Sequence, residues 1–453
     1  MQAIPKGLRI VLWTAAVVGL GGLYINGARR HLHEVNTSME STDQGSYLEY
    51  AVNMRETGYA YVGGRNQMPL YPFLQSLFYD SGATLDEIFT RGKALNIALS
   101  VVLLGVLFLV WRRWFPLLQT TALLLVTAFT VFLFRAAYVQ VELLYYVLAF
   151  GTFLFLCRML EAPSWRLALV AGAWVGLTHL AKASVLPGLG LFLIVSFLRA
   201  GWVALQMARG EAASRKPGFG ALGRELAQAG AVVLVFLVTI SPYLVTSKRV
   251  FGHALYNVNS TFYMWYDTWA DAMHGTIPYG DRIGWPTLPP EQLPGPAKYL
   301  REHTVDDIVT RVTDGLRFLF GRAVHTYGYW KYVLFYGAVA VLVLVMNWRW
   351  TVGMMKRHPF VVLFGLGYFP GYVLLYAWYV PIAHGNRLVL ALFLPFMFAV
   401  GCILLARARA EQAEARGPLA RWFTAVHLLL IGGIALELYD ILARRIVTMY
   451  AGD

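Results

Sequence analysis

Long apolar runs separated by polar connections dominate the chain. A run of roughly 20 apolar residues is what an α-helix needs to cross the hydrocarbon core of a bilayer. We predict spanning helices near residues 8–26, 92–111, 117–134, 139–157, 167–184, 186–199, 226–246, 331–347, 359–379, 387–406 and 422–441. The pattern therefore predicts an all-α polytopic membrane protein with about eleven transmembrane helices.

Two connections, 27–91 and 247–330, are much longer than the others. The first contains two segments, Gln44–Glu56 and Leu70–Tyr79, whose mixed aromatic, aliphatic and polar side chains are typical of amphipathic helices on a bilayer surface. The second is rich in aromatic residues and turn formers and ends in a helical stretch, Asp306–Phe320. We expect the second connection to close over a site as a lid.

Composition and charge indicate a single transmembrane domain over 1–453. Hydrophobic residues make up 58% of the chain and charged residues only 14%, which excludes a water-soluble globular protein. The net charge of +13 reflects basic residues in the short connections, as the positive-inside effect requires, so no nucleic-acid partner is expected. This distribution predicts a multi-pass protein of the inner or plasma membrane, with both long connections on the extracytoplasmic face.

Asp43 is the leading candidate for chemistry, because it is a carboxylate placed just after the first predicted span and before a surface helix. A carboxylate at the membrane–water boundary can act as a general base toward a hydroxyl, a role that contributes ~10²- to 10⁴-fold in rate. Asp is also a common N-cap residue, so the same position is explained by capping of the helix that begins at Gln44. The two roles are compatible.

Glu142 is the second candidate, at the outer end of the fourth predicted span. An ionised carboxylate at that depth is costly unless it faces protein, water or a cation, so it marks either a functional site or a paired structural acid. If a divalent metal ion is present, Asp43 and Glu142 are the oxygen ligands that the sequence offers. The sequence does not decide whether such an ion is bound.

Several cations on the predicted outer face are candidates for binding a phosphate: Arg65, Lys182, Arg387 and the pair Lys248-Arg249. Arg387 is the best placed, since it opens a span directly after an outer turn. For Lys182 and Arg387 the alternative is a side chain that extends along the helix to reach the interface. Tyr263, within the aromatic part of the second long connection, is a candidate for stacking on a sugar ring.

A family resemblance rests mainly on the first long connection. Its residues are Asp43, Tyr47, Ala51, Met54, Gly58, Arg65 and Pro69-Leu70-Tyr71-Pro72, with shorter matches at Glu142, Gly176–Lys182, Ser241-Pro242-Tyr243 and Asn386-Arg387-Leu388. With these residues the chain resembles the GT-C superfamily of membrane glycosyltransferases, particularly the bacterial aminoarabinose transferase of lipid A and the protein O-mannosyltransferases. Asp43 takes the position of that family's catalytic acid.

The resemblance implies a GT-C fold and an inverting transfer of a sugar from a polyprenyl-phosphate carrier to a hydroxyl of a lipid, glycan or protein acceptor. In that reaction Asp43 is the base, Glu142 assists it, and Tyr47, Arg65, Lys182 and Arg387 contact substrate. Two other classes stay open from the residues alone. Interior ionisable residues also mark a lipid or solute transporter or flippase, and polar loops also serve a non-catalytic assembly subunit in the membrane.

Overall fold

The computed structural model describes residues 6–59, 66–80, 82–209, 219–281, 283–383, 385, 387–415 and 418–450, and every regular element in these ranges is helical. The long helices are α1 (Lys6–Glu34), α4 (Leu85–Trp114), α5 (Leu117–Thr127), α7 (Glu142–Glu161), α8 (Trp165–Ala181), α9 (Leu186–Ala208), α10 (Phe219–Phe251), α14 (Val305–His325), α15 (Trp330–Met346), α16 (Trp348–Arg357), α17 (Pro359–Tyr379), α18 (Phe393–Ala415) and α19 (Arg421–Asp440). The shorter ones are α2 (Gln44–Glu56), α3 (Leu70–Ser76), α6 (Leu133–Arg135), α11 (Val258–Thr261), α12 (Trp269–His274), α13 (Pro296–Glu302) and α20 (Ile446–Thr448).

The predicted all-α polytopic architecture is confirmed. Each of the predicted spans falls on a helix, and within the described residues 8 helical segments are long and apolar enough to cross a membrane. Helices α14 and α15, which meet at a bend of 106°, bring this number to 9 when they are counted as one span. Helix α8 has only 17 residues and is not among these segments.

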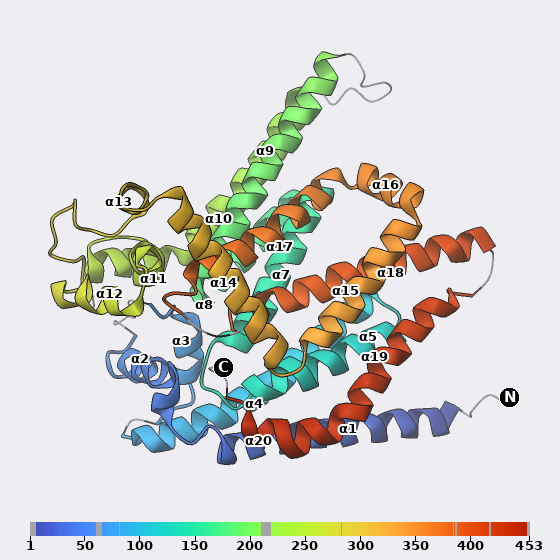
Figure 1. The fold of residues 1–453 in the computed structure, drawn as a ribbon, viewed down its shortest axis with the longest axis horizontal. Helices are drawn as coiled ribbons and strands as arrows, with labels where there is room; N and C mark the ends of the chain where they lie inside the picture. The colour runs from blue at the N-terminus through green and yellow to red at the C-terminus, as the bar shows by residue number, and fades with distance from the viewer. Residues whose placement is uncertain are drawn as a thin grey trace.

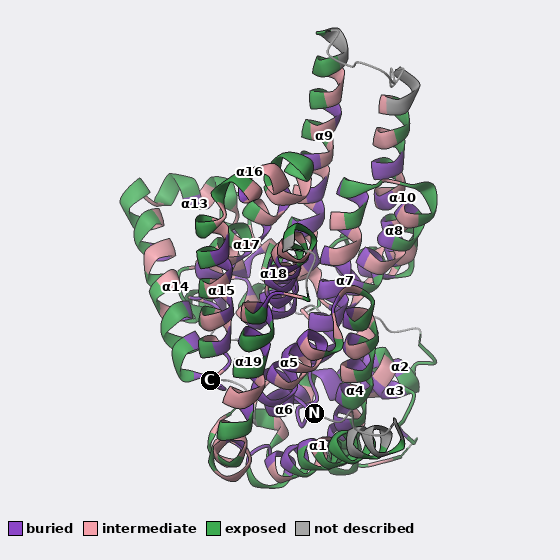
Figure 2. Ribbon diagram, turned by 90° about the vertical axis from the view of Figure 1, so that its right-hand side faces the viewer, coloured by how far each residue is buried: buried purple, intermediate pink, exposed green. Residues whose placement is uncertain are grey.

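The bundle has an inner group of helices and an outer group. Helices α5, α7 and α18 are largely buried, whereas α9, α10 and α19 leave most of their surface open (Figure 2). The open surface of α9 is apolar, with Ile194 and Phe197 more than half exposed. Exposed apolar side chains on long helices indicate contact with lipid rather than water.

A non-helical stretch interrupts the buried core between α6 and α7. Helix α5 continues through a π-helical turn, Ala128–Phe132, into α6, and the chain then runs without regular structure from 136 to 141 before α7 begins. Backbone groups in a buried break need partners other than helical ones. Asn96 donates to the Ala136 carbonyl, and the Val139 amide donates to the Gln44 side chain at 2.9 Å.

The two long connections meet on one side of the bundle. Helices α2 and α3 lie on the same side as α11 and α12 in Figure 1, and the Asn257 side-chain amide donates to the Asn66 carbonyl oxygen at 3.1 Å. The predicted surface helices are present: α2 has the predicted bounds, α3 ends at Ser76 rather than Tyr79, and α14 extends the predicted stretch at both ends. This side of the molecule therefore gathers the candidate residues.

Candidate active site

Asp43 lies at the start of α2 but does not cap it. It occupies the N-cap position, yet its side chain makes no capping hydrogen bond. Instead Oδ2 accepts a hydrogen bond from Nη1 of Arg387 at 2.5 Å. The Asp43 side chain keeps 47% of its surface exposed, so a second group can approach it. The sequence allowed Asp43 to be a general base or a side-chain N-cap, and the structure does not show the side-chain cap.

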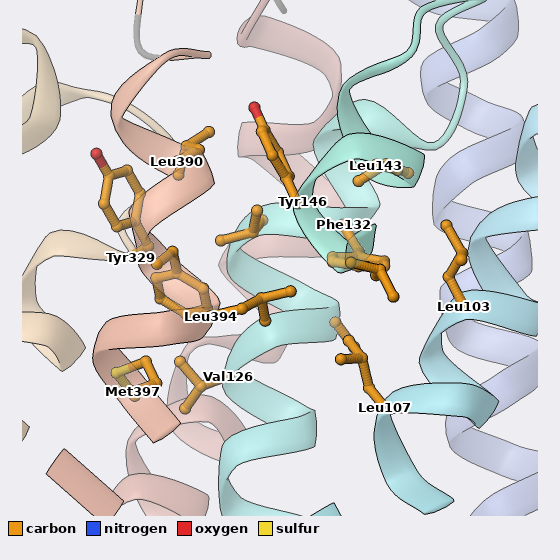
Figure 3. Close-up of a cluster of buried hydrophobic side chains, with 14 of the residues drawn as sticks. Leu103, Leu107, Val126, Phe132, Leu143, Tyr146, Tyr329, Leu390, Leu394 and Met397 are labelled. Carbon is orange, nitrogen blue, oxygen red and sulfur yellow. The ribbon is translucent and has the colours of Figure 1, made fainter. Parts of the chain in front are cut away.

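Arg387 is anchored to the apolar core through its backbone. The hydroxyl of Tyr146, on α7, donates to the Arg387 carbonyl oxygen at 2.8 Å. Figure 3 shows Tyr146 among buried core residues, with its hydroxyl pointing away from Val126 and Met397. The guanidinium itself is held by its hydrogen bond to Asp43, and 24% of the Arg387 side chain is exposed.

Glu142 and Lys182 form a second carboxylate–cation pair. Glu142 is the first residue of α7, and Lys182 directly follows the last residue of α8. The Lys182 Nζ atom lies 3.3 Å from Oε1 of Glu142, whose side chain is only 3% exposed. Oε2 of Glu142 is buried without a hydrogen-bond partner among the described residues. An unmet acceptor of this kind costs about 1–3 kcal/mol unless a bound group satisfies it.

Arg135 is a site residue that the sequence analysis missed. It ends α6, is 2% exposed, and has two guanidinium nitrogens, Nε and Nη2, that find no acceptor within the described part of the chain. Its other contacts are weak: Nη1 lies 3.5 Å from Oε1 of Gln140, and the guanidinium carbon lies 5.6 Å from the Tyr327 ring centroid. The available signal was a charged residue inside an apolar run, at the end of a predicted span.

Five charged groups form one electrostatic cluster, called the charged cluster below: Asp43, Arg135, Glu142, Lys182 and Arg387. Glu142 interacts with Lys182, Arg387 and Arg135, and Arg387 interacts with Asp43 as well as Glu142. Three cations face two carboxylates, so the cluster carries an excess of one positive charge. A buried excess of positive charge with unmet N–H donors favours an anionic ligand.

Tyr47 borders the cluster from α2. Its side chain is buried, and it packs edge-on against Tyr71 with ring centroids 5.4 Å apart. Burial, followed by the negative charges of Glu142 and Asp43, raises the pKa of Tyr47 well above its ordinary value. The phenol therefore stays protonated and can donate a hydrogen bond at neutral pH.

A buried amide pair sets the position of Asp43 relative to the break between α6 and α7. Asn36 and Gln44 exchange two side-chain hydrogen bonds, both of 2.8 Å. Asn36 also donates to the Ala137 carbonyl, and Gln44 also accepts from the Val139 amide. Gln44 directly follows Asp43, so these bonds tie the candidate base to the segment that leads into Glu142.

The remaining predicted residues divide into two cases. Tyr263 is buried in a separate aromatic cluster of the second long connection and donates to Oδ2 of Asp281 at 2.9 Å. The structure thus places it inside the loop, rather than in the charged cluster. Arg65 lies outside the described residues, as do two neighbours of Arg387, His384 and Asn386.

The two carboxylates do not form a metal site by themselves. The described residues contain no group of three or more His, Cys, Asp or Glu side chains arranged to hold a metal ion. Asp43 and Glu142 are each engaged by a neighbouring cation, which would compete electrostatically with a divalent ion for the same oxygens. The residues present therefore fit a metal ion poorly.

Comparisons with known proteins give a likeness in overall shape. No protein-family model matches the chain, and no curated protein matches it. Among solved structures, the apo oligosaccharyltransferase of Archaeoglobus fulgidus aligns with 95% of this chain and 56% of its own, at 14% identity and a TM-score of 0.48. The chain therefore spans little more than half the length of that enzyme. A likeness of this size assigns no activity to the chain.

Proposed function

We propose that this protein is an integral-membrane glycosyltransferase that moves a sugar from a polyprenyl-phosphate carrier to an acceptor hydroxyl on the extracytoplasmic face. The observation that carries the proposal is the pairing of Asp43, from the first long connection, with Arg387, from the segment that leads into α18. This pairing puts a proton acceptor beside a group suited to phosphate.

The charged cluster supports a division of roles between its members. Arg387 has five N–H donors, of which one contacts Asp43, so the others remain able to hold a phosphate oxygen. The unmet donors of Arg135 and the ammonium of Lys182 add positive charge on the same side. The acceptor hydroxyl then approaches the exposed part of Asp43.

The reaction proposed for this arrangement is a single displacement. The acceptor oxygen forms a bond to the anomeric carbon and passes its proton to Asp43. The bond between that carbon and the phosphate oxygen breaks, and its electron pair stays on the phosphate, where Arg387, Arg135 and Lys182 stabilise the added charge. Attack from the side opposite the phosphate inverts the anomeric configuration.

Glu142 has a positioning role in this proposal. Its buried carboxylate neutralises part of the positive charge and holds Lys182 at 3.3 Å. The buried Oε2 atom, which has no hydrogen-bond partner among the described residues, can accept a hydrogen bond from a sugar hydroxyl of the donor. The second long connection, 247–330, acts as a lid over this site, as its aromatic and turn-rich sequence predicts.

Activity in purified protein tests the proposal against the transporter and assembly-subunit alternatives. Protein in detergent or nanodiscs is incubated with a panel of polyprenyl-phosphate sugars and hydroxyl acceptors, and products are detected by mass spectrometry. Release of polyprenyl phosphate together with a glycosylated acceptor is expected. Movement of the intact lipid-linked sugar across a vesicle bilayer without any cleavage would contradict the proposal and favour the transporter.

A further inference from the structure

A hollow separate from the charged cluster lies between α14 and the end of α17. It has a volume of about 560 Å³, within the range of roughly 300–1,000 Å³ typical of small-ligand sites. Its lining consists of Asp267, Tyr299, His303, Asp307, Thr310, Arg311, Asp314, Gly315, Phe318, Val380 and Pro381. Gly315 makes the close packing behind it possible, since a side chain at this position would clash with the Ala377 carbonyl of α17.

The one guanidinium in this lining makes four hydrogen bonds within the protein. Arg311 donates to Oδ1 of Asp267 at 2.9 Å, to the carbonyl of Trp378 at 3.0 Å, and to the carbonyls of Met264 and Tyr266 at 3.1 and 2.9 Å. Its side chain is only 5% exposed. It therefore fixes the loop to α14 and offers little to an incoming anion.

His303 is engaged in the same way. Its Nε2 atom lies 2.8 Å from Oδ2 of Asp267, and its Nδ1 atom lies 3.0 Å from the Tyr299 carbonyl oxygen. Both partners can only accept hydrogen bonds, so this geometry favours the protonated ring, in which both nitrogens donate. Its two donors are used within the protein and are not directed at a ligand.

The groups that remain open are acceptors. Asp307 and Asp314 lie two turns apart on the face of α14 that lines the hollow, with Thr310 between them. Asp307 accepts from Thr304, and Asp314 accepts from Arg317. A carboxylate has about four lone-pair sites, so each retains sites for further donors.

The hollow and the charged cluster thus have opposite character. The cluster has an excess of positive charge, whereas the hollow is lined by three carboxylates against one guanidinium and one histidine. Val380 and Pro381 place the hollow near Arg387 in the sequence, and the preceding residue, Tyr379, interacts electrostatically with Arg387 and Asp43. An anionic donor is favoured by the cluster and disfavoured by the hollow.

We propose that this hollow binds the acceptor substrate and rejects anions. The group it binds is rich in hydrogen-bond donors, either a neutral polyhydroxyl sugar or an amine-bearing sugar. The assignment as acceptor site rests on the proposed function. The binding chemistry itself rests only on the lining. Hydroxyl or ammonium groups donate to Asp307, Asp314 and Thr310, while Phe318 and Pro381 pack against the C–H groups of the ring.

Three sugars matched in ring size test the chemistry by direct binding to the full chain in nanodiscs: methyl glucoside, glucosamine and glucose 1-phosphate. Calorimetry or saturation-transfer NMR should show saturable binding of methyl glucoside, glucosamine or both that the filling variant Thr310→Phe removes, with any glucose 1-phosphate binding removed by that variant at least about tenfold weaker. Binding of methyl glucoside identifies the hydroxyls as the source of recognition, and binding of glucosamine alone identifies the amine. Equal binding of glucose 1-phosphate that Thr310→Phe removes, or no binding of methyl glucoside and glucosamine, would overturn the proposal.

Variants locate the binding and separate it from turnover. The double variant Asp307→Asn, Asp314→Asn and the filling variant Thr310→Phe should each weaken binding about tenfold or more, because they remove the acceptor charge or the space. Asp306→Asn, an exposed acid on the same helix that does not line the hollow, is the matched control. Asp43→Asn should leave sugar binding unchanged even if turnover is lost, so failure of the proposed function and failure of this inference give different results. Undiminished binding in both lining variants would place the sugar elsewhere and refute the assignment.

Discussion

The Nη1 atom of Arg387 and the Oδ2 atom of Asp43 lie 2.5 Å apart although 344 residues separate them in the chain. The pair joins the first long connection to the segment that leads into α18. It is partly open to solvent, with 24% of the Arg387 side chain and 47% of the Asp43 side chain exposed. Ion pairs with this exposure contribute little to stability, typically below about 1 kcal/mol. Substitutions at Asp43 and Arg387 can therefore be tested for their effect on turnover and donor binding without a large effect on folding.

Replacing Asp43 with Asn should lower turnover by about 100-fold or more while leaving the protein folded and able to bind donor. The amide keeps the size of the side chain but cannot take the acceptor proton, and no capping bond is lost. Steady-state kinetics together with thermal unfolding in detergent measure the two effects. Asp86→Asn, an exposed acid in the first turn of α4, is the control. A large loss of stability with normal activity in the folded fraction would show that Asp43 is structural.

Replacing Arg387 with Lys should raise the donor Kd by about tenfold, and replacing it with Ala should raise it further. Lysine keeps the charge but loses the planar fork of donors that contacts a carboxylate and a phosphate together. Binding of a short-chain polyprenyl phosphate, measured by calorimetry, separates this effect from turnover. Arg301→Ala, on α13, controls for a general loss of positive charge. Unchanged donor affinity in the Ala variant would remove Arg387 from the phosphate site.

Replacing Arg135 with Met should weaken donor binding without destabilising the empty protein by more than about 1 kcal/mol. The native guanidinium is buried with two unmet donors, each of which costs roughly 1–3 kcal/mol, and an apolar side chain of similar length removes that cost. Thermal unfolding without ligand and with polyprenyl phosphate gives both quantities. We expect added ligand to raise the Tm of the native protein clearly more than that of the variant. A variant that fails to fold would instead show that the cation is required by the fold.

His303 should make stability depend on pH near neutrality. Desolvation opposes its charged form, but hydrogen bonds to the Tyr299 carbonyl and Asp267 and the negative charge of Asp267 together raise its pKa above the ordinary value. A raised pKa in the folded state means that the contribution is complete below about pH 6.5, the ordinary value, and is lost as the pH rises through the folded-state pKa. Unfolding across this range should therefore show a falling Tm that His303→Asn flattens and that His325→Asn leaves in place.

Local pattern decided much of the fold. The apolar runs located the helices of the eleven predicted spans, because a spanning segment must satisfy its backbone hydrogen bonds internally and cover itself with apolar side chains. They did not locate α16, which has 10 residues and lies between two of the predicted spans. The bounds of α2 and most of α14 were predicted from turn formers and capping residues, whose effect extends over only a few positions in the sequence. Glu142, Lys182 and Arg387 could be named as candidates because a charge at the edge of an apolar run is unusual. Asp43 was named for its place in the polar connection before the surface helix and for the family resemblance.

Only the tertiary structure decided how these residues combine. Sequence could not show that Asp43 pairs with Arg387, since that contact depends on how distant helices pack. It likewise could not show that Arg135 is buried with unmet donors, because position in an apolar run does not say which face of a helix meets protein and which meets lipid. Tyr263 was a candidate by composition, whereas the folded loop turns it inward to Asp281. Helix periodicity is set by neighbours a few residues away, but a site is set by contacts between elements, and these are fixed only when the bundle closes.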